Sequence, residues 1–246
     1  MDIIQISDCH LFADLDATLA GVNTAQTLLK VLQVITDDEI PDLILVTGDV
    51  AHDEGRTTYE QFKGMLDKLD INYYCLPGNH DQPRYLKSVF GDNFVGQFHN
   101  FIWNGWQIIL LSTAMPGNVS GRLNSQQLAM LSNALHAHRK PTVIFMHHHA
   151  VPIQCPWLDN IGLENADEFL AILHSTSAVK AVFCGHVHQE FIHHQNKIAF
   201  YGTPSTCFQF KPHSLTVEYD DALPAYRSIK LCKDGLINTQ VVRVET

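Results

Sequence analysis

Short apolar runs alternate with amphipathic segments over the first 184 residues. Six runs have the length and composition of strands that are buried on both faces. They span residues 3–6, 43–46, 73–76, 108–111, 143–146 and 179–184. Between them, residues 24–36, 57–69 and 125–137 carry leucine and aromatic residues at helical spacing, and Asn124 or Ser125 is placed to cap the third helix. This alternation predicts crossover units and a layered α/β fold.

The pattern changes after residue 184. Alternating or aromatic runs near 190–194, 198–201, 215–219, 226–232 and 238–243 are separated by turns, without convincing helical spacing. We expect this C-terminal fifth to be antiparallel. One sheet built from crossover units and one completed by this meander, packed face to face with helices outside, predict a four-layer α/β/β/α sandwich. The 246 residues fit one domain over 1–246, because no internal repeat or linker interrupts them.

Composition narrows the classes of function. The chain has 16 basic and 26 acidic residues and a formal net charge of −10, which disfavours a protein built to grip nucleic-acid backbone. No apolar run approaches the roughly 20 residues of a membrane span, and the N-terminus lacks the pattern of a signal peptide. The six cysteines are scattered without a CxxC pair. We therefore expect reduced thiols, a cytoplasmic location and neither a nucleic-acid nor a membrane partner.

Candidate metal ligands come directly after the predicted strands. Five stretches combine carboxylate, amide and imidazole side chains: 8–10, 48–49, 78–81, 147–149 and 185–188. Because the carboxyl ends of strands in an open α/β sheet line one crevice, we expect these loops to converge. Gly48, Gly78 and Gly185 would let the backbone turn sharply there. The seven candidate ligands are Asp8, His10, Asp49, Asn79, His147, His186 and His188.

The number and type of these ligands predict two metal ions. Seven ligands are too many for one tetrahedral zinc, but they suit two ions whose shells are completed by water. Mixed nitrogen and oxygen donors favour iron, manganese or zinc over calcium or copper(I). Two such ions, roughly 3.5–4 Å apart, can share a carboxylate and a bridging hydroxide for in-line attack on phosphorus. Their charge would also attract a phosphate anion to an acidic protein.

The ordered series DxH, GD, GNHD, a single downstream histidine and GHxH resembles the signature of the calcineurin-like metallophosphoesterases. The resemblance implies which side chains hold each ion. The first ion would be held by Asp8, His10, Asp49 and His188. The second would be held by Asp49, Asn79, His147 and His186. Asp49 would then bridge the two ions.

Longer segments extend the resemblance over nearly the whole chain. Together, ISDCHLF, GVNT, LPGNHD, HHHAVP, WLDNIGLENADEF, GHVHQE and PSTCFQFKPH are similar to the class III 3′,5′-cyclic-AMP phosphodiesterases of bacteria. This implies hydrolysis of the 3′ ester of cyclic AMP to AMP, with iron(II), manganese(II) or zinc(II) in the site. His80 would bind a phosphoryl oxygen or protonate the leaving 3′ oxygen. The residues expected around the substrate are His10, Asp49, Asn79, His80 and His188.

The metal-binding motifs indicate the type of reaction, but they do not identify the substrate. A dinuclear site of this kind could act on another phosphodiester or on a monoester, because the motifs leave the specificity pocket open. A scaffold that binds a partner protein without turnover is a third interpretation. The presence of all seven candidate ligands and His80 disfavours it.

Several neighbouring residues have a structural interpretation beside a functional one. We expect His148 and His149 to lie beside the metals rather than to bind them. For Asp81, a turn residue that caps a helix near 83–89 is at least as well supported as a catalytic role, so we leave it out of the catalytic set. For Phe208 and Phe210 we favour core packing, with a platform for stacking adenine as the alternative.

Three positions depart from the pattern of the family, Cys9, His52 and Ser112, and His52 bears on His80. Many phosphoesterases have an aspartate three residues after the bridging one, and it orients the histidine of GNH. That place is taken here by His52, so the partner of the His80 imidazole is left open.

Overall fold

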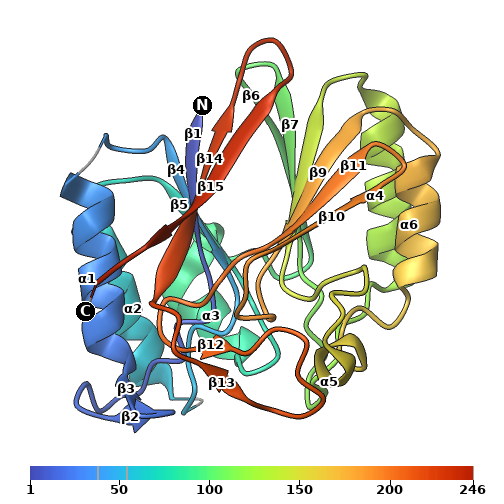
Figure 1. Cartoon of the computed structure of the whole chain (residues 1–246). Helices are drawn as coiled ribbons and strands as arrows, with labels where there is room; N and C mark the ends of the chain where they lie inside the picture. Colours follow the sequence, from blue (N-terminus) through green and yellow to red (C-terminus); the bar gives the residue numbers. More distant parts are fainter. Residues whose placement is uncertain (38, 54, 246) are drawn as a thin grey trace.

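Two β-sheets pack face to face in this computed structural model, which describes residues 1–37, 39–53 and 55–245 (Figure 1). The first sheet has the order β15 (Ile237–Arg243), β14 (Ala225–Leu231), β1 (Asp2–Ile6), β4 (Leu43–Thr47) and β5 (Tyr73–Leu76). The second has the order β10 (Phe191–Gln195), β11 (Ile198–Gly202), β9 (Val179–Cys184), β8 (Thr142–Met146), β7 (Trp106–Leu111) and β6 (Phe98–Trp103). All six predicted strands are present within these sheets.

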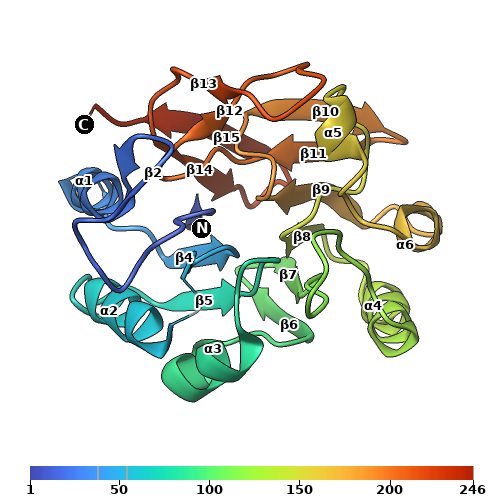
Figure 2. The ribbon, with the colours of Figure 1, turned by 90° about the horizontal axis from the view of Figure 1, so that it is seen from below.

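Helices cover both outer faces (Figure 2). Outside the first sheet lie α1 (Thr24–Asp37), α2 (Arg56–Asp67) and α3 (Pro83–Phe90). Outside the second lie α4 (Ser125–Ala137) and α6 (Ala166–His174). The predicted four-layer α/β/β/α sandwich is therefore confirmed. Among the described residues, no helix is both long enough and apolar enough to cross a membrane.

Shorter elements connect the layers. They are β2 (Thr18–Leu19), β3 (Val22–Asn23), a 3₁₀ turn at Gly91–Asn93, α5 (Pro156–Asp159), β12 (Gln209–Phe210) and β13 (Tyr219–Asp220). Figure 1 shows β12, β13 and α5 below the two sheets. The cap predicted for α4 is confirmed, since the Asn124 side chain accepts from the Gln127 backbone and the Gln127 side chain accepts from the Asn124 backbone.

The continuous apolar runs have two buried faces each. In β1, Ile3 lies in the core between the sheets, whereas Ile4 and Ile6 lie in the core beneath the helices of the first sheet. In β7, Ile108 faces the other sheet and Ile109 faces the helices of the second sheet. Successive side chains of a strand point to opposite faces, so a strand between two layers needs apolar residues at every position.

The expected C-terminal meander is wrong in three respects. Its strands divide between the sheets: β10 and β11 join the second sheet, and β14 and β15 join the first. Moreover, β11 runs parallel to β9, and the run at 215–219 forms a strand only from Tyr219 onward. Alternation along a strand does not reveal the direction of its neighbour. Here β11 pairs with the backbone of β9, which would otherwise be an edge strand with unpaired N–H and C=O groups.

A buried polar network joins the two sheets. It includes Gln5 and Thr47, which come three residues before Asp8 and two residues before Asp49. Gln5 Nε2 donates to Thr47 Oγ1 at 2.9 Å, and Thr203 Oγ1 donates to Gln5 Oε1 at 2.7 Å. Arg227 donates from Nε to Thr203 Oγ1 and from a terminal nitrogen to the Gly202 carbonyl. Because each buried group in this set has a partner, the network positions one sheet against the other.

Candidate metal centre

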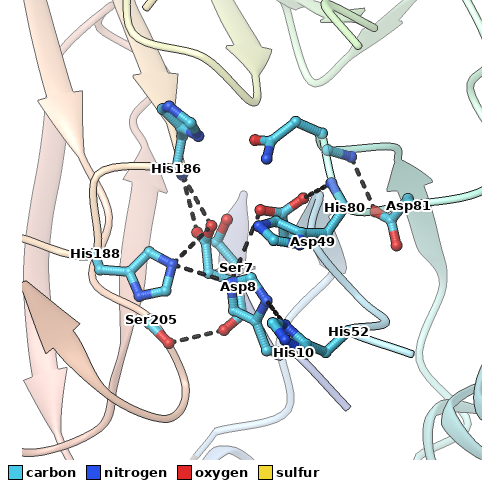
Figure 3. A network of polar contacts seen from close by, with 12 residues as sticks. Ser7, Asp8, His10, Asp49, His52, His80, Asp81, His186, His188 and Ser205 are labelled. Atoms are coloured by element: carbon cyan, nitrogen blue, oxygen red, sulfur yellow. Dashed lines mark hydrogen bonds and ion pairs between the residues drawn. The ribbon is translucent and has the colours of Figure 1, made fainter. Parts of the chain in front are cut away.

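The eight predicted site residues all follow parallel strands. Asp8 and His10 come after β1, Asp49 after β4, Asn79 and His80 after β5, His147 after β8, and His186 and His188 after β9. These strands belong to both sheets, and their loops meet in one place (Figure 3). The convergence expected from the sequence is therefore present, and the site lies across the seam between the sheets.

One group of donors consists of Asp8, His10 and His188. Their ligand atoms lie within 4.8 Å of one another, and all three side chains are buried. His188 Nε2 is 3.3 Å from Asp8 Oδ1 and 3.2 Å from His10 Nε2. Three donor atoms at this spacing, two imidazole nitrogens and a carboxylate oxygen, could hold one divalent ion.

A second group lies around His147. Its Nε2 is 3.4 Å from Asp49 Oδ2 and 3.1 Å from Asn79 Oδ1. The same Asp49 oxygen is 3.8 Å from Nε2 of His10 in the first group. Asp49 thus faces both groups at once, which is the position that a bridging carboxylate needs.

Two of the imidazoles are oriented by backbone carbonyls. His147 Nδ1 donates to the Thr47 carbonyl at 2.7 Å, and His188 Nδ1 donates to the Phe208 carbonyl at 3.0 Å. A carbonyl only accepts, so each ring carries a proton on Nδ1 and turns Nε2 into the site. This is how outer groups commonly orient metal-binding histidines.

His186 fits a metal because its ring has an unused atom. Within the described part of the chain, buried His186 Nε2 has no hydrogen-bond partner. Burial among other imidazoles also holds the His186 pKa well below its usual range, so the ring is neutral. An unpaired buried polar atom costs about 1–3 kcal/mol. A divalent cation would satisfy it, since neutral imidazole is the form that binds metals.

The carboxylates remain charged despite their burial. Burial by itself favours the neutral acids, but the facing imidazoles of His188 and His147 lower the pKa of Asp8 and Asp49 respectively. Asp8 also accepts the His186 backbone N–H, at 3.1 Å on Oδ1 and 3.0 Å on Oδ2. Two carboxylates therefore supply negative charge at the centre of the donor set.

The backbone of five candidate ligands is left-handed, which the sequence did not indicate. The φ angles are 56° at Asp8, 45° at His10, 51° at Asp49, 66° at His186 and 46° at His188. Such angles are uncommon outside glycine and cost about 1–3 kcal/mol each. Loop hydrogen bonds maintain them: the His10 N–H donates to the Asp49 carbonyl at 2.9 Å. Five of the twelve described non-glycine residues with positive φ are candidate ligands, which supports a functional site.

Of the three predicted turn glycines, Gly48 alone has a positive φ, at 99°. A Cβ there would lie 2.5 Å from His147 Nδ1 and 2.7 Å from the Gly78 nitrogen. At Gly78 and Gly185 a side chain is excluded by close neighbours instead. A Cβ on Gly78 would collide with Asp49, and one on Gly185 would collide with Ser7 and Asp8.

Gly48→Ala is expected to lower the free energy of unfolding by about 2–4 kcal/mol, since it adds a collision to backbone strain. Urea denaturation measures the change. Gly235→Ala is the matched control, because Gly235 has φ 87° and open space around its Cβ position, so it should lose only about 1 kcal/mol. Equal losses in the two variants would contradict the collision at Gly48.

His80 lies at the exposed edge of the site. Its backbone N–H donates to Asp49 Oδ1 at 2.8 Å. Its ring stacks on His52, with centroids 5.2 Å apart and planes at 23°, and stands edge-on to His10 at 4.9 Å. In residues 1–37, 39–53 and 55–245, no carboxylate bonds to this imidazole. The sequence left open which residue orients the His80 imidazole. In the structure its ring contacts are those with His52 and His10.

Asp81 has a structural role, but the helix cap expected for it is wrong. Its carboxylate accepts from the backbone of Val50, Ala51 and Gly78 and from the Tyr59 hydroxyl, at 2.9–3.2 Å. The residue preceding α3 is Gln82, which makes no side-chain cap. Four donors occupy the carboxylate, so Asp81 ties the loop after β5 to the loop after β4.

His148 and His149 lie beside the candidate ligands. His148 is fully buried, with Nδ1 2.7 Å from Thr113 Oγ1 and Nε2 3.2 Å from the Val119 carbonyl. His149 Nε2 is 3.8 Å from Asp159. Both nitrogens of His148 are therefore engaged, which supports the expectation that it stands behind the metal ligands.

Comparison with known proteins identifies the family of this chain. The family model of the calcineurin-like phosphoesterases matches residues 1–190. The chain belongs to this family. Among calcineurin-like phosphoesterases, it is 37% identical to the 3′,5′-cyclic adenosine monophosphate phosphodiesterase CpdA of Escherichia coli, over 98% of this chain and 89% of the relative.

Two further similarities bear on the family. The 3′,5′-cyclic-nucleotide phosphodiesterase alr5338 of Nostoc is 34% identical over 99% of this chain and 92% of its own length. A solved structure of a dimetal phosphatase from Danio rerio has a TM-score of 0.70 and 14% identity, covering 99% of each chain. The low identity of the solved structure makes it a likeness of fold alone.

Proposed function

We propose that this calcineurin-like phosphoesterase hydrolyses 3′,5′-cyclic AMP to AMP at a dinuclear metal centre. The observation that carries the proposal is the position of Asp49 between two groups of donors, in a chain similar over nearly its whole length to cyclic-nucleotide phosphodiesterases. One ion would be held by Asp8, His10, Asp49 and His188. The other would be held by Asp49, Asn79, His147 and His186.

The donor set favours iron(II) or manganese(II), with zinc(II) as an alternative. It combines four imidazoles, two carboxylates and one amide, which suits borderline divalent ions. When bound, the two ions lower the pKa of water and stabilise negative charge on phosphorus.

The side chains supply positioning and a proton. In the proposed reaction an oxygen from water bonds to phosphorus and the bond from phosphorus to the 3′ oxygen breaks, which leaves the phosphate on the 5′ oxygen. His80 would bind a phosphoryl oxygen or donate its ring proton to the departing 3′ oxygen. Its exposed position and its hydrogen bond from the backbone to Asp49 support this role. His10, Asp49, Asn79 and His188 would lie around the bound phosphate.

We further propose that residues 1–246 act as one domain with a small cyclic nucleotide as partner. Support comes from β14, which lies beyond the part matched by the family model and pairs with β1. The cytoplasmic location stays a prediction, and six free cysteines, five of them buried, agree with a reducing compartment. A dinuclear site of this kind could also turn over another phosphodiester or a monoester, because the metal-binding motifs leave the specificity pocket open.

The test compares kcat/KM for 3′,5′-cyclic AMP, 2′,3′-cyclic AMP and bis(4-nitrophenyl) phosphate on manganese-loaded protein. We expect 3′,5′-cyclic AMP to be preferred by about tenfold or more. Elemental analysis should give about two ions per chain, and chelation should abolish activity until manganese is restored. A preference for the artificial diester by orders of magnitude would keep the dinuclear centre and reject the substrate.

A further inference from the structure

A cavity of about 220 Å³ opens over the candidate metal centre. Part of its lining is polar and belongs to the centre: His10, Asp49, Asn79, His80, His186 and His188. Another part is apolar or aromatic: Leu19, Val119, Trp157, Leu158, Ile161, Phe208, Phe210, Val217 and Tyr219. In this second part the described lining residues include no charged side chain. The cavity therefore offers an anion site and an uncharged surface to the same ligand.

Three aromatic side chains dominate the uncharged part, and we call them the aromatic wall: Trp157, Phe210 and Tyr219. Phe210 of β12 pairs directly with Tyr219 of β13, and their rings lie 6.0 Å apart at 22°. Trp157 of α5 stands edge-on to Phe210 at 4.8 Å. Its indole N–H donates to Ser214 Oγ at 3.1 Å. Strand pairing places Phe210 and Tyr219 side by side, and this hydrogen bond orients the Trp157 ring.

The aromatic wall begins next to a candidate metal ligand. The Phe210 backbone N–H donates to the His188 carbonyl at 3.2 Å. The Phe210 ring centroid is 4.5 Å from that of His188. Farther out, Tyr219 is 55% exposed. A ligand whose phosphate lies at the metal centre would thus meet exposed aromatic surface beyond His188.

Phe208 also lines the cavity, but its ring is more deeply buried than that of Phe210. It lies 5.6 Å from the His10 ring with planes at 29°, and is 4.7 Å from His188. Phe208 therefore packs mainly against the candidate ligands, as favoured from the sequence. Phe210, two residues away, is only partly buried and lines the cavity with Trp157 and Tyr219.

We propose that the aromatic wall stacks against the purine base of the cyclic nucleotide. This inference rests on the proposed function and deepens it by assigning the base-binding residues. An uncharged aromatic surface beside an anion site matches a ligand with a neutral planar ring attached to a phosphate. Stacking on aromatic side chains accepts any base with a large π-face. The aromatic wall should favour purines over pyrimidines, and stacking alone does not distinguish adenine from guanine.

The test uses Tyr219→Ala, Tyr219→Phe and the control Leu215→Ala on manganese-loaded full-length chain. Leu215 is 76% exposed in the same segment and does not line the cavity. We expect Tyr219→Ala to raise KM for 3′,5′-cyclic AMP about tenfold, with kcat within about twofold of the parent, because the lost stacking contributes to binding. Tyr219→Phe keeps the ring and should restore KM. For the base-free methyl riboside 3′,5′-cyclic phosphate, all variants should match the parent.

A second measurement separates this inference from the proposed function. Binding of a slowly hydrolysed phosphorothioate analogue of cyclic AMP is followed by tryptophan fluorescence, with Trp157→Phe to assign the signal. The affinity should fall about tenfold in Tyr219→Ala. If cyclic AMP is hydrolysed but Tyr219→Ala changes neither KM nor analogue affinity, the aromatic wall is not the base site. If only bis(4-nitrophenyl) phosphate is hydrolysed, the proposed function fails, and analogue affinity alone decides the inference.

Discussion

Asp49→Asn is expected to lower kcat/KM for 3′,5′-cyclic AMP by about 10³-fold or more. Asp49 faces His10 in one donor group and His147 in the other, and it is the proposed bridge between the ions. Asparagine keeps the size of the side chain but removes the charge that would be shared by both ions. The loss should therefore appear in metal content as well as in rate.

Elemental analysis of the purified variant measures the metal directly. We expect fewer than two ions per chain, together with a far-UV circular dichroism spectrum like that of the parent. Asp14→Asn is the control, because Asp14 is exposed and belongs to neither donor group. Two tightly held ions and parental activity in Asp49→Asn would refute a bridging role.

His80→Ala is expected to lower kcat by about 10²–10⁴-fold while leaving the metal content unchanged. The imidazole is exposed, and its contribution to the metal centre is a backbone hydrogen bond to Asp49, which alanine retains. The proposed role of the ring is proton donation or phosphoryl binding. Its removal should therefore act on the chemical step rather than on folding.

The measurement is kcat beside metal content and urea stability for the same preparation. His194→Ala is a matched control, since His194 is exposed on β10, away from the candidate centre. A His80→Ala protein that has lost its metal would assign His80 to the centre instead. Full activity with both ions present would remove His80 from the mechanism.

Local pattern was sufficient for most of the strands and for the donor set. A strand such as β4 is buried on both faces, so most of its residues are apolar without alternation. Such an apolar run can be recognised without knowing which strands pair with it. Short polar motifs directly after such runs predicted that Asp8, Asp49 and His186 lie together at the carboxyl ends of the strands. The elements that local pattern missed, such as α6 and the edge strand β6, are short or only partly buried.

Other features depend on contacts between residues far apart in the chain. The cap expected at Asp81 is wrong because Tyr59 and the backbone of the loop after β4 supply its donors. His52 stacks on His80, although nothing in the sequence near either residue indicates it. β11 runs parallel to β9, a direction that the alternation of its own residues does not indicate.

The sequence by itself determined the layered α/β class and the seven candidate ligands, because each follows from apolar periodicity or from donor chemistry at a strand end. The role expected for His80 came from the resemblance to a known family. Only the tertiary structure decided how these side chains are oriented: which imidazole nitrogens face inward, which ligands take left-handed backbone, and which aromatic rings line the cavity. The physical reason is that orientation is set by carbonyls, rings and backbone donors that fold in from distant segments. A linear pattern records the residue types but not these neighbours.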